Sequence, residues 1–180
     1  MAQRNTLKYI ILGLINERPV TGYELTKAFD SDIGEFWLAQ HSQIYPLLKR
    51  MEHDQLITHQ LEVTGEKLER KRYAITPDGQ QELADWLNEP VTKLNANKDE
   101  FILKLYFIRD RQDGRLLPML TTQLQLHQQK RNHLQDQMAQ KFPDAAHIEA
   151  YGHFLILQHA ISREQDYCQW LTNTISNLTA

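Results

Sequence analysis

The sequence predicts a mainly α-helical chain with a single β-hairpin in its first half. Apolar residues recur three and four residues apart through most of the 180 residues, which is typical of helices with one buried face. Between residues 57 and 75 this spacing gives way to strand-like alternation around a Thr64-Gly65-Glu66 turn. After residue 98 the helical spacing continues alone. We therefore expect a mixed domain at residues 1–90 and an all-helical domain at residues 98–180.

The first two helices are indicated by periodicity and by a capping signal. A stripe at positions i, i+3, i+4 and i+7 predicts a helix over residues 5–16: Leu7, Ile10, Ile11 and Leu14. Thr21 and Glu24 then form a capping box, in which each side chain can bind the other residue's backbone N–H. This box predicts a second helix up to about Phe29, with Leu25 and Phe29 facing inward.

The third helix has one apolar and one polar face. Its apolar stripe consists of Ile44, Leu47, Leu48 and Met51, and Ser42 is its expected N-cap. The opposite face carries hydroxyl, amide and cationic side chains, which are the groups that contact phosphates and base edges. Pro46 lies near the end of the first turn, where it is slightly unfavourable.

A basic hairpin and a fourth helix complete this half. The returning strand includes residues 67–72 (KLERKR), whose four cations and one carboxylate give a local charge of +3. Thr76 as N-cap and Pro77 as first helical residue predict a helix to Asn88, which buries Leu83, Trp86 and Leu87. The order helix, helix, helix, strand, strand, helix is that of a winged helix-turn-helix that binds duplex DNA. The alternative is a polar surface helix beside a solvated strand edge.

Under the DNA-binding interpretation, the contacts come from the third helix and the wing. The candidates are Ser42, Gln43, Tyr45, Pro46, Lys49, Arg50, Lys67, Arg70, Lys71 and Arg72. The overall charge runs against this interpretation, because the chain is −3 with a pI near 6.2. Residues 1–90 hold ten Lys and Arg against fourteen Asp and Glu, a balance of −4. We therefore expect modest non-specific affinity and a specificity that depends on dimerisation.

The second half is predicted to contain three helices, over residues 98–109, 115–141 and 145–176. Phe101, Leu105 and Ile108 mark the first. The second has a heptad-like seam in which two members are polar: Leu117, Leu120, Leu124, His127, Arg131, Leu134 and Met138. Two long amphipathic helices need a further surface to cover them, which favours a homodimer over a monomeric hairpin packed on its own N-terminal domain. The candidate dimerisation residues are Leu117, Leu120, Leu124, Tyr167, Trp170 and Leu171.

The segments HSQIYPLLKRME, KLERKRYAIT and TPDGQQELADWL resemble the PadR family of bacterial transcriptional regulators. The resemblance continues through residues 98–107 and 151–171 and so covers nearly the whole chain. It is strongest to the phenolic acid-responsive repressors of the larger subfamily. The resemblance implies a homodimer that represses a phenolic acid decarboxylase gene. It also implies release from the operator by hydroxycinnamic acids such as p-coumarate or ferulate.

A small-molecule site is compatible with three clusters of aromatic and polar residues. A hydroxycinnamate needs a flat apolar slot, a partner for its phenol and a donor for its carboxylate. The candidates are Trp37, His41, Lys104, Tyr106, Phe107, His153 and Phe154, with Phe36 and Tyr151 beside them. Alternatively these aromatic residues are core. A ligand that contacted Trp37 and His41, just before the third helix, would shift the dimer towards a state that no longer fits the operator.

No catalytic or metal-binding motif accompanies these features. The sequence has no HExxH, P-loop, GxGxxG or nucleophile-elbow pattern, and its single cysteine, Cys168, is best explained as a small residue in a helix. Because these motifs are missing, we expect a non-enzymatic protein without cofactor or metal. We expect it to be cytoplasmic, because the sequence shows neither a membrane span nor a secretory signal. The alternatives to the repressor are a winged-helix protein-interaction module and a regulator that responds to a different apolar ligand.

Overall fold

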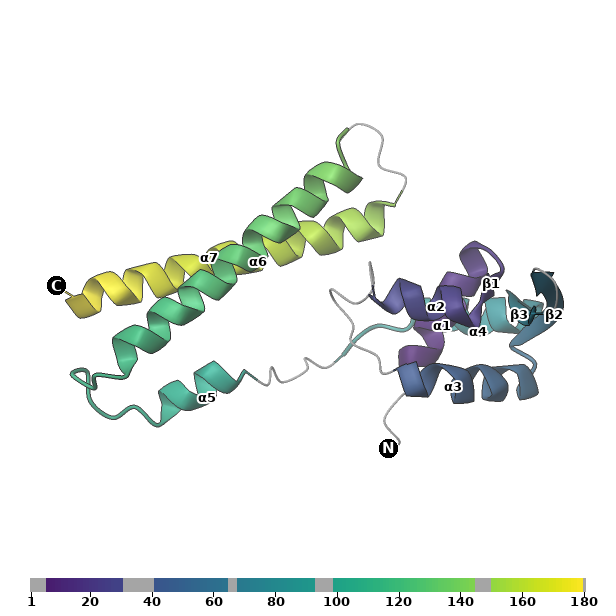
Figure 1. Cartoon of the computed structure of the whole chain (residues 1–180), viewed down its shortest axis with the longest axis horizontal. Helices are drawn as coiled ribbons and strands as arrows, with labels where there is room; N and C mark the ends of the chain where they lie inside the picture. Colours follow the sequence, from purple (N-terminus) through teal and green to yellow (C-terminus); the bar gives the residue numbers. More distant parts are fainter. Residues whose placement is uncertain (1–5, 31–40, 65–67, 93–98, 145–149, 180) are drawn as a thin grey trace. The chain divides into compact units, whose positions relative to one another are not determined.

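The computed structural model describes residues 6–30, 41–64, 68–92, 99–144 and 150–179. Contacts divide the chain into two compact units, Met1–Leu94 and Asn95–Ala180, and each is described by itself. The first unit combines helices with a small antiparallel sheet, and the second contains helices in its described part (Figure 1). The prediction of a mainly helical chain with a winged helix-turn-helix at its N-terminus is confirmed.

The N-terminal unit has the predicted order of helices and an additional short strand. Its elements are α1 (Thr6–Glu17), β1 (Val20–Thr21), α2 (Gly22–Asp30), α3 (His41–His53), β2 (Ile57–Thr64), β3 (Leu68–Ile75) and α4 (Pro77–Asn88). The sheet has the strand order β1-β3-β2, and both pairings are antiparallel. β1 was not predicted, because two residues are too few for alternation to be visible.

The core of this unit lies where α1, α2 and α3 meet the base of the sheet. Ile11, Leu12, Leu25, Ile44 and Leu48 are almost completely buried in it. The predicted apolar stripe of α3 is buried along its whole length. In α1 the buried stripe is displaced from the predicted one, so that Ile10 and Leu14 are only partly buried while Tyr9, Leu12 and Ile15 are buried.

α4 packs on α1 along a narrow stripe. Trp86 stacks on Tyr9 with ring centroids 4.7 Å apart, and Leu83 is buried beside them. Leu87, which was predicted to be buried, is 68% exposed. This prediction was wrong, because α4 packs mainly on α1. Trp86 faces α1, and Leu87, the next residue along the helix, faces outward.

The helix ends show where local signals were sufficient. Glu24 accepts hydrogen bonds from the backbone N–H and the hydroxyl of Thr21, and Thr21 accepts one from the backbone of Glu24, so the capping box is confirmed. Thr76 caps α4 by accepting from the Gly79 N–H at 3.1 Å. Ser42 lies inside α3 and is not its N-cap, because the helix already includes His41.

The C-terminal unit is a helical hairpin with a short helix at its open end. Its elements are α5 (Glu100–Tyr106), α6 (Leu116–Lys141) and α7 (Tyr151–Thr179). α6 and α7 run antiparallel, since Phe142 contacts His153 at one end and Arg111, just before α6, binds the Asn177 carbonyl at the other. α5 packs against the open end through Phe101 (Figure 1). None of the described helices combines the length and apolar character needed to span a membrane.

The predicted dimerisation residues divide into two groups in this hairpin. Leu120 and Leu171 are buried within one chain, and Leu124 and Tyr167 pack beside them. Leu117 and Trp170 are about two-fifths exposed. Intrachain packing of α5, α6 and α7 therefore accounts for much of the seam, and only the latter two residues present substantial surface to another molecule.

Candidate nucleic-acid interface and effector residues

The outer face of α3 is exposed and polar, as a recognition helix requires. Because its four apolar residues face the core, the remaining side chains point outward at helical spacing. The described candidates on this helix are all exposed: Ser42, Gln43, Tyr45, Pro46, Lys49 and Arg50. Hydroxyl, amide and guanidinium groups on one exposed helix face can bind phosphate oxygens and base edges in the major groove.

The wing and the recognition helix share one hollow. Tyr45 and Lys49 of α3 line it together with Arg70 and Lys71 of β3, and its volume is about 410 Å³. The N-terminus of α2 forms another wall, through Gly22 and Tyr23. The hollow therefore gathers three cations from two elements that are separated by about twenty residues in the sequence.

A second, smaller hollow lies on the other side of α3. It is lined by Ser42, Gln43, Pro46 and Arg50, with Leu7 of α1 opposite, and has a volume of about 330 Å³. The predicted residues of α3 thus divide between a side facing the wing and a side facing α1. A DNA duplex that lies along α3 would contact residues on both of these sides.

The cations of the wing differ in their surroundings. Arg70 is exposed and, among the described residues, makes no ion pair. Lys71 lies 3.4 Å from Glu52 at the end of α3. Arg72 instead donates hydrogen bonds to Glu62, Glu24 and the Pro19 carbonyl, so its charge is largely satisfied within the protein. Lys67 lies outside the described residues.

Glu52 joins the recognition helix to both strands of the wing. Its carboxylate accepts hydrogen bonds from His59 of β2 and from Lys71 of β3. Burial by itself would raise the pKa of Glu52, but the hydrogen bond and charge of His59, together with Lys71, outweigh it and hold the pKa below its ordinary value. This carboxylate therefore stays ionised at neutral pH and ties the wing to α3.

The predicted effector residues of the C-terminal unit lie in two separate groups within its described part. Tyr106 and Phe107 lie at the end of α5, exposed and edge to face at 5.4 Å, and Lys104 pairs with Glu100. His153 and Phe154 instead surround Phe142 at the closed end of the hairpin, with centroid distances of 5.5 and 5.7 Å. These two groups are separated by most of the length of α6. Trp37 and the side chain of His41 lie outside the described residues.

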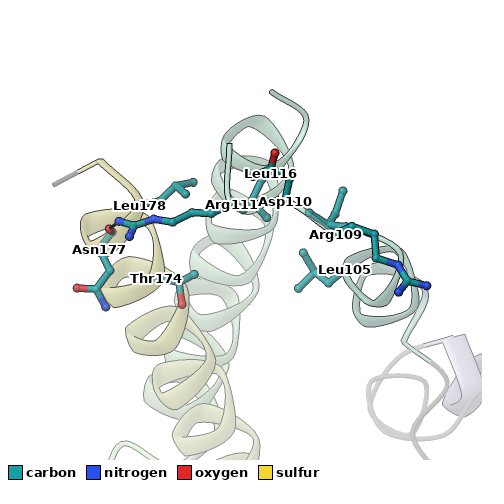
Figure 2. A pocket seen from close by; sticks show the side chains of 9 residues that line it. Leu105, Arg109, Asp110, Arg111, Leu116, Thr174, Asn177 and Leu178 are labelled. Atoms are coloured by element: carbon teal, nitrogen blue, oxygen red, sulfur yellow. Dashed lines mark hydrogen bonds between the residues drawn. The ribbon is translucent and has the colours of Figure 1, made fainter. Parts of the chain in front are cut away.

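The open end of the hairpin contains a wide hollow of about 680 Å³. Leu105, Ile108, Leu116 and Leu178 form its apolar lining. Figure 2 shows Arg111 extending across the opening to the Asn177 carbonyl, while Arg109 points away from α7. Sequence reasoning placed no site here, because its lining residues are distributed over three helices and a loop.

A polar cluster, centred on the buried Glu164, lies within the hairpin. His127 donates to the carboxylate, and Lys130 and Arg163 lie 3.5 Å from it. His127 also stacks on Tyr167 at 4.0 Å, and the Tyr167 hydroxyl donates to Asp99, the N-cap of α5. Within the described part of the chain, no three His, Cys, Asp or Glu residues are grouped so that they could hold a metal ion.

Comparison with known proteins agrees with this architecture. The profile of the transcriptional regulator PadR-like family matches residues 11–85, and that of the virulence activator alpha C-terminal family matches residues 97–179. The negative transcriptional regulator PadR of Bacillus subtilis is 39% identical over 176 residues, which cover 94% of this chain and 96% of the relative.

Solved structures of the same relative superpose on nearly the whole chain. B. subtilis PadR in complex with operator DNA has a TM-score of 0.88 at 38% identity, covering 97% of this chain and 99% of that one. The complex with p-coumaric acid has a TM-score of 0.83 at 36% identity, with the same coverage. Because the identity and the fold extend over both units, the chain belongs to the PadR-like family of transcriptional regulators.

Proposed function

We propose that this protein is a repressor that binds palindromic operator DNA as a homodimer and is released by a small aromatic acid. The observation that carries the proposal is the hollow in which Tyr45 and Lys49 of the recognition helix meet Arg70 and Lys71 of the wing. Clustered cations offset the acidic balance of the surrounding domain, because phosphate binding depends on local charge.

In this proposal α3 enters the major groove and the wing follows the adjacent backbone. The residues of the helix that read base edges or hold phosphates are Gln43, Tyr45, Lys49 and Arg50. Ser42 and Pro46 lie on the same exposed part of α3, where the helix would come nearest to the DNA. Arg70 and Lys71 contact phosphates from the wing. Two copies related by a two-fold axis would place two such faces about 34 Å apart, on successive turns of the duplex.

Exposed apolar side chains of the C-terminal unit support the homodimer. Ile102, Leu103 and Tyr106 on α5 and Phe107 just after it are 45–74% exposed. Trp170 on α7 lies beside Phe101 of α5, and Leu117 on α6 is also exposed. A concentration of large apolar residues on a short helix is typical of an interface. Pairing with a second copy would remove this surface from water.

The proposed effector is a hydroxycinnamic acid, and the proposed target is the gene of the decarboxylase that consumes it. Support comes from the B. subtilis relative, a negative regulator that has been crystallised with p-coumaric acid. Phe142, His153 and Phe154 offer an aromatic surface with a polar tip, which suits a phenolic ring. Trp37, His41 and Lys104 remain proposed contacts that another element or a second copy would complete.

The test is fluorescence anisotropy with labelled DNA from a phenolic acid decarboxylase promoter, at stated salt, with and without p-coumarate. We expect specific binding that p-coumarate abolishes and that benzoate, which lacks the phenol, leaves intact. Lys49→Ala should raise the operator Kd about tenfold, since one good base or phosphate contact is worth roughly 1–3 kcal/mol. Arg109→Ala, an exposed cation of the other unit, is the matched control.

Each alternative outcome has a distinct meaning. Binding that ignores phenolic acids would retain the repressor and replace the effector. Binding that is absent even at low salt would instead favour the winged-helix interaction module, to which the −4 balance of residues 1–90 lends weight. Light scattering of the same samples measures the oligomeric state, and a monomer would contradict the homodimer.

A further inference from the structure

We infer that Arg72 is a positioning residue for DNA binding that fixes the angle of the wing, and that it is not itself a phosphate contact. This inference rests on the proposed function, because it concerns how the wing is presented to the operator. It separates Arg72 from Arg70, although the two cations are two residues apart on the same strand.

The geometry around Arg72 is that of a clamp. Its Nε donates to Glu62 on β2 at 2.8 Å, and one terminal nitrogen donates both to the Pro19 carbonyl at 3.0 Å and to Glu24 on α2 at 3.3 Å. The other terminal nitrogen lies 2.8 Å from Glu62. A single planar guanidinium on β3 therefore joins the second wing strand to the first, to the chain before β1 and to the first turn of α2.

The acceptors of this clamp are themselves held in place. The Glu24 oxygen that faces Arg72 also accepts from the backbone N–H of Thr21 at 2.7 Å and from its hydroxyl at 2.9 Å. Thr21 is in turn the sheet partner of Arg72 through the β1–β3 pairing. The clamp thus closes a ring of contacts through side chains and backbone, which fixes β3 relative to the helix-turn-helix.

Charge balance argues against a role in phosphate binding. Glu24 and Glu62 face Arg72, and Arg18 lies 3.6 Å from Glu24, so two cations meet two carboxylates and the cluster is neutral. A phosphate would have to displace these carboxylates from Arg72. Arg70 is exposed, lies on the hollow beside Lys49 and pairs with no carboxylate among the described side chains.

Operator affinity as a function of salt, measured on the full-length chain, distinguishes the two roles. For Arg70→Gln we expect a loss of affinity for operator and random DNA alike, and a salt slope smaller by about one unit, because one phosphate contact is removed. For Arg72→Gln we expect operator Kd to rise about tenfold while random-sequence binding and the salt slope stay close to wild type, because positioning affects specificity.

Lysine substitutions give the sharper comparison. Lysine keeps the charge but cannot reach three acceptors with a planar fork, so Arg72→Lys should lose as much operator affinity as Arg72→Gln. Arg70→Lys should lose less affinity than Arg70→Gln and should keep the wild-type salt slope, because its charge is retained. Glu62→Gln, which leaves Arg72 charged but weakens the clamp, should also lower operator specificity. Amide hydrogen exchange of β1 and β3 should accelerate in the Arg72 variants and in Glu62→Gln, but not in the Arg70 variants.

The outcomes separate the two proposals. An Arg72→Lys variant that retains operator binding, or an Arg72→Gln variant whose salt slope falls by about one unit, would overturn the clamp and make Arg72 a phosphate contact. Unchanged hydrogen exchange at β1 in all Arg72 variants would overturn it independently of DNA. A wild-type protein that does not distinguish operator from random DNA would overturn the proposed function, and the DNA role of the clamp with it.

Discussion

The Nδ1 nitrogen of His127 on α6 donates a hydrogen bond to the carboxylate of Glu164 on α7, and that carboxylate side chain is only 3% exposed. Lys130 and Arg163 each lie 3.5 Å from the other oxygen of this carboxylate. A buried carboxylate surrounded by cationic and hydrogen-bonding groups in this way joins the two long helices near the middle of the hairpin. Its ionisation is therefore linked to the stability of the C-terminal unit.

Glu164→Gln should destabilise the hairpin and reduce its sensitivity to acid. Burial alone would raise the pKa of Glu164, but the His127 hydrogen bond and the charges of Lys130, His127 and Arg163 hold the pKa below the ordinary 4.5. A carboxylate whose pKa is lowered by folding stabilises the protein above the unfolded pKa and loses this contribution as pH falls through the folded value. The free energy of unfolding should therefore fall below about pH 4.5 in wild type and less steeply in the variant.

Urea denaturation between pH 7 and pH 3, followed by circular dichroism at fixed protein concentration, measures this difference. At pH 7 we expect a loss of about 1–3 kcal/mol, the range for a hydrogen bond to a charged group. Glu100→Gln is the control, since that carboxylate is exposed and, among the described residues, pairs with Lys104 on the same helix. Equal pH profiles for wild type and Glu164→Gln would contradict the linkage.

Asp99→Ala should loosen α5 without unfolding α6 and α7. One oxygen of Asp99 accepts from the backbone N–H groups of Phe101 and Ile102, and the other accepts from the Tyr167 hydroxyl at 3.2 Å. Loss of an N-cap costs about 1 kcal/mol, and asparagine is nearly as good a cap as aspartate. Hydrogen exchange of the α5 amides should therefore accelerate in Asp99→Ala and remain slow in Asp99→Asn. Slow exchange of the α5 amides in both variants would contradict this expectation, because it would mean that apolar packing of Phe101 holds α5 without the cap.

The sequence predicted most reliably those elements whose ends carry their own chemical signal. The bounds of α4 agree with prediction at Pro77 and Asn88, because Thr76 and Pro77 mark its start and Glu89-Pro90 follows its end. The Thr21–Glu24 capping box was likewise readable from a three-residue spacing. β1 carries no comparable signal, since it exists only because β3 provides a partner for its two residues.

The partners of individual side chains could not be predicted from the sequence, because they are distant in it. Arg72 looked equivalent to Arg70 within the run KLERKR, but its acceptors come from residues 19, 24 and 62. His127 was one of the two polar members of the predicted heptad-like seam, and the sequence did not identify its partner, which is Glu164 of the same chain. Spacing shows which residues share a face of a helix, but it does not identify the surface that covers this face.

Gly79→Ala should destabilise the N-terminal unit by about 1–3 kcal/mol or more, as overpacking of a close backbone contact does. A Cβ at this position would lie 2.0 Å from the Leu56 carbonyl oxygen and 2.9 Å from Ile75. The same carbonyl accepts a hydrogen bond from the Thr76 N–H, so it cannot move without disturbing the cap of α4. Thermal unfolding would measure the effect, with Gly114→Ala as control because no atom lies within 4 Å of its added Cβ. Equal melting temperatures for the two variants would contradict this account.

Gly22→Ala should weaken operator binding while leaving the fold nearly intact. An added Cβ would lie 2.7 Å from the Tyr45 ring, and this ring belongs to a half-exposed side chain that can turn away. The expected consequence is displacement of Tyr45 from the hollow that it shares with Lys49 and Arg70, and an operator Kd raised by a factor of about three to ten, within the range of one specific contact. Gly13→Ala, whose Cβ meets no atom within 4 Å, is the control and should bind as wild type. Anisotropy titrations with the operator fragment make the comparison. If Gly22→Ala binds as well as Gly13→Ala, the orientation of Tyr45 does not contribute to recognition.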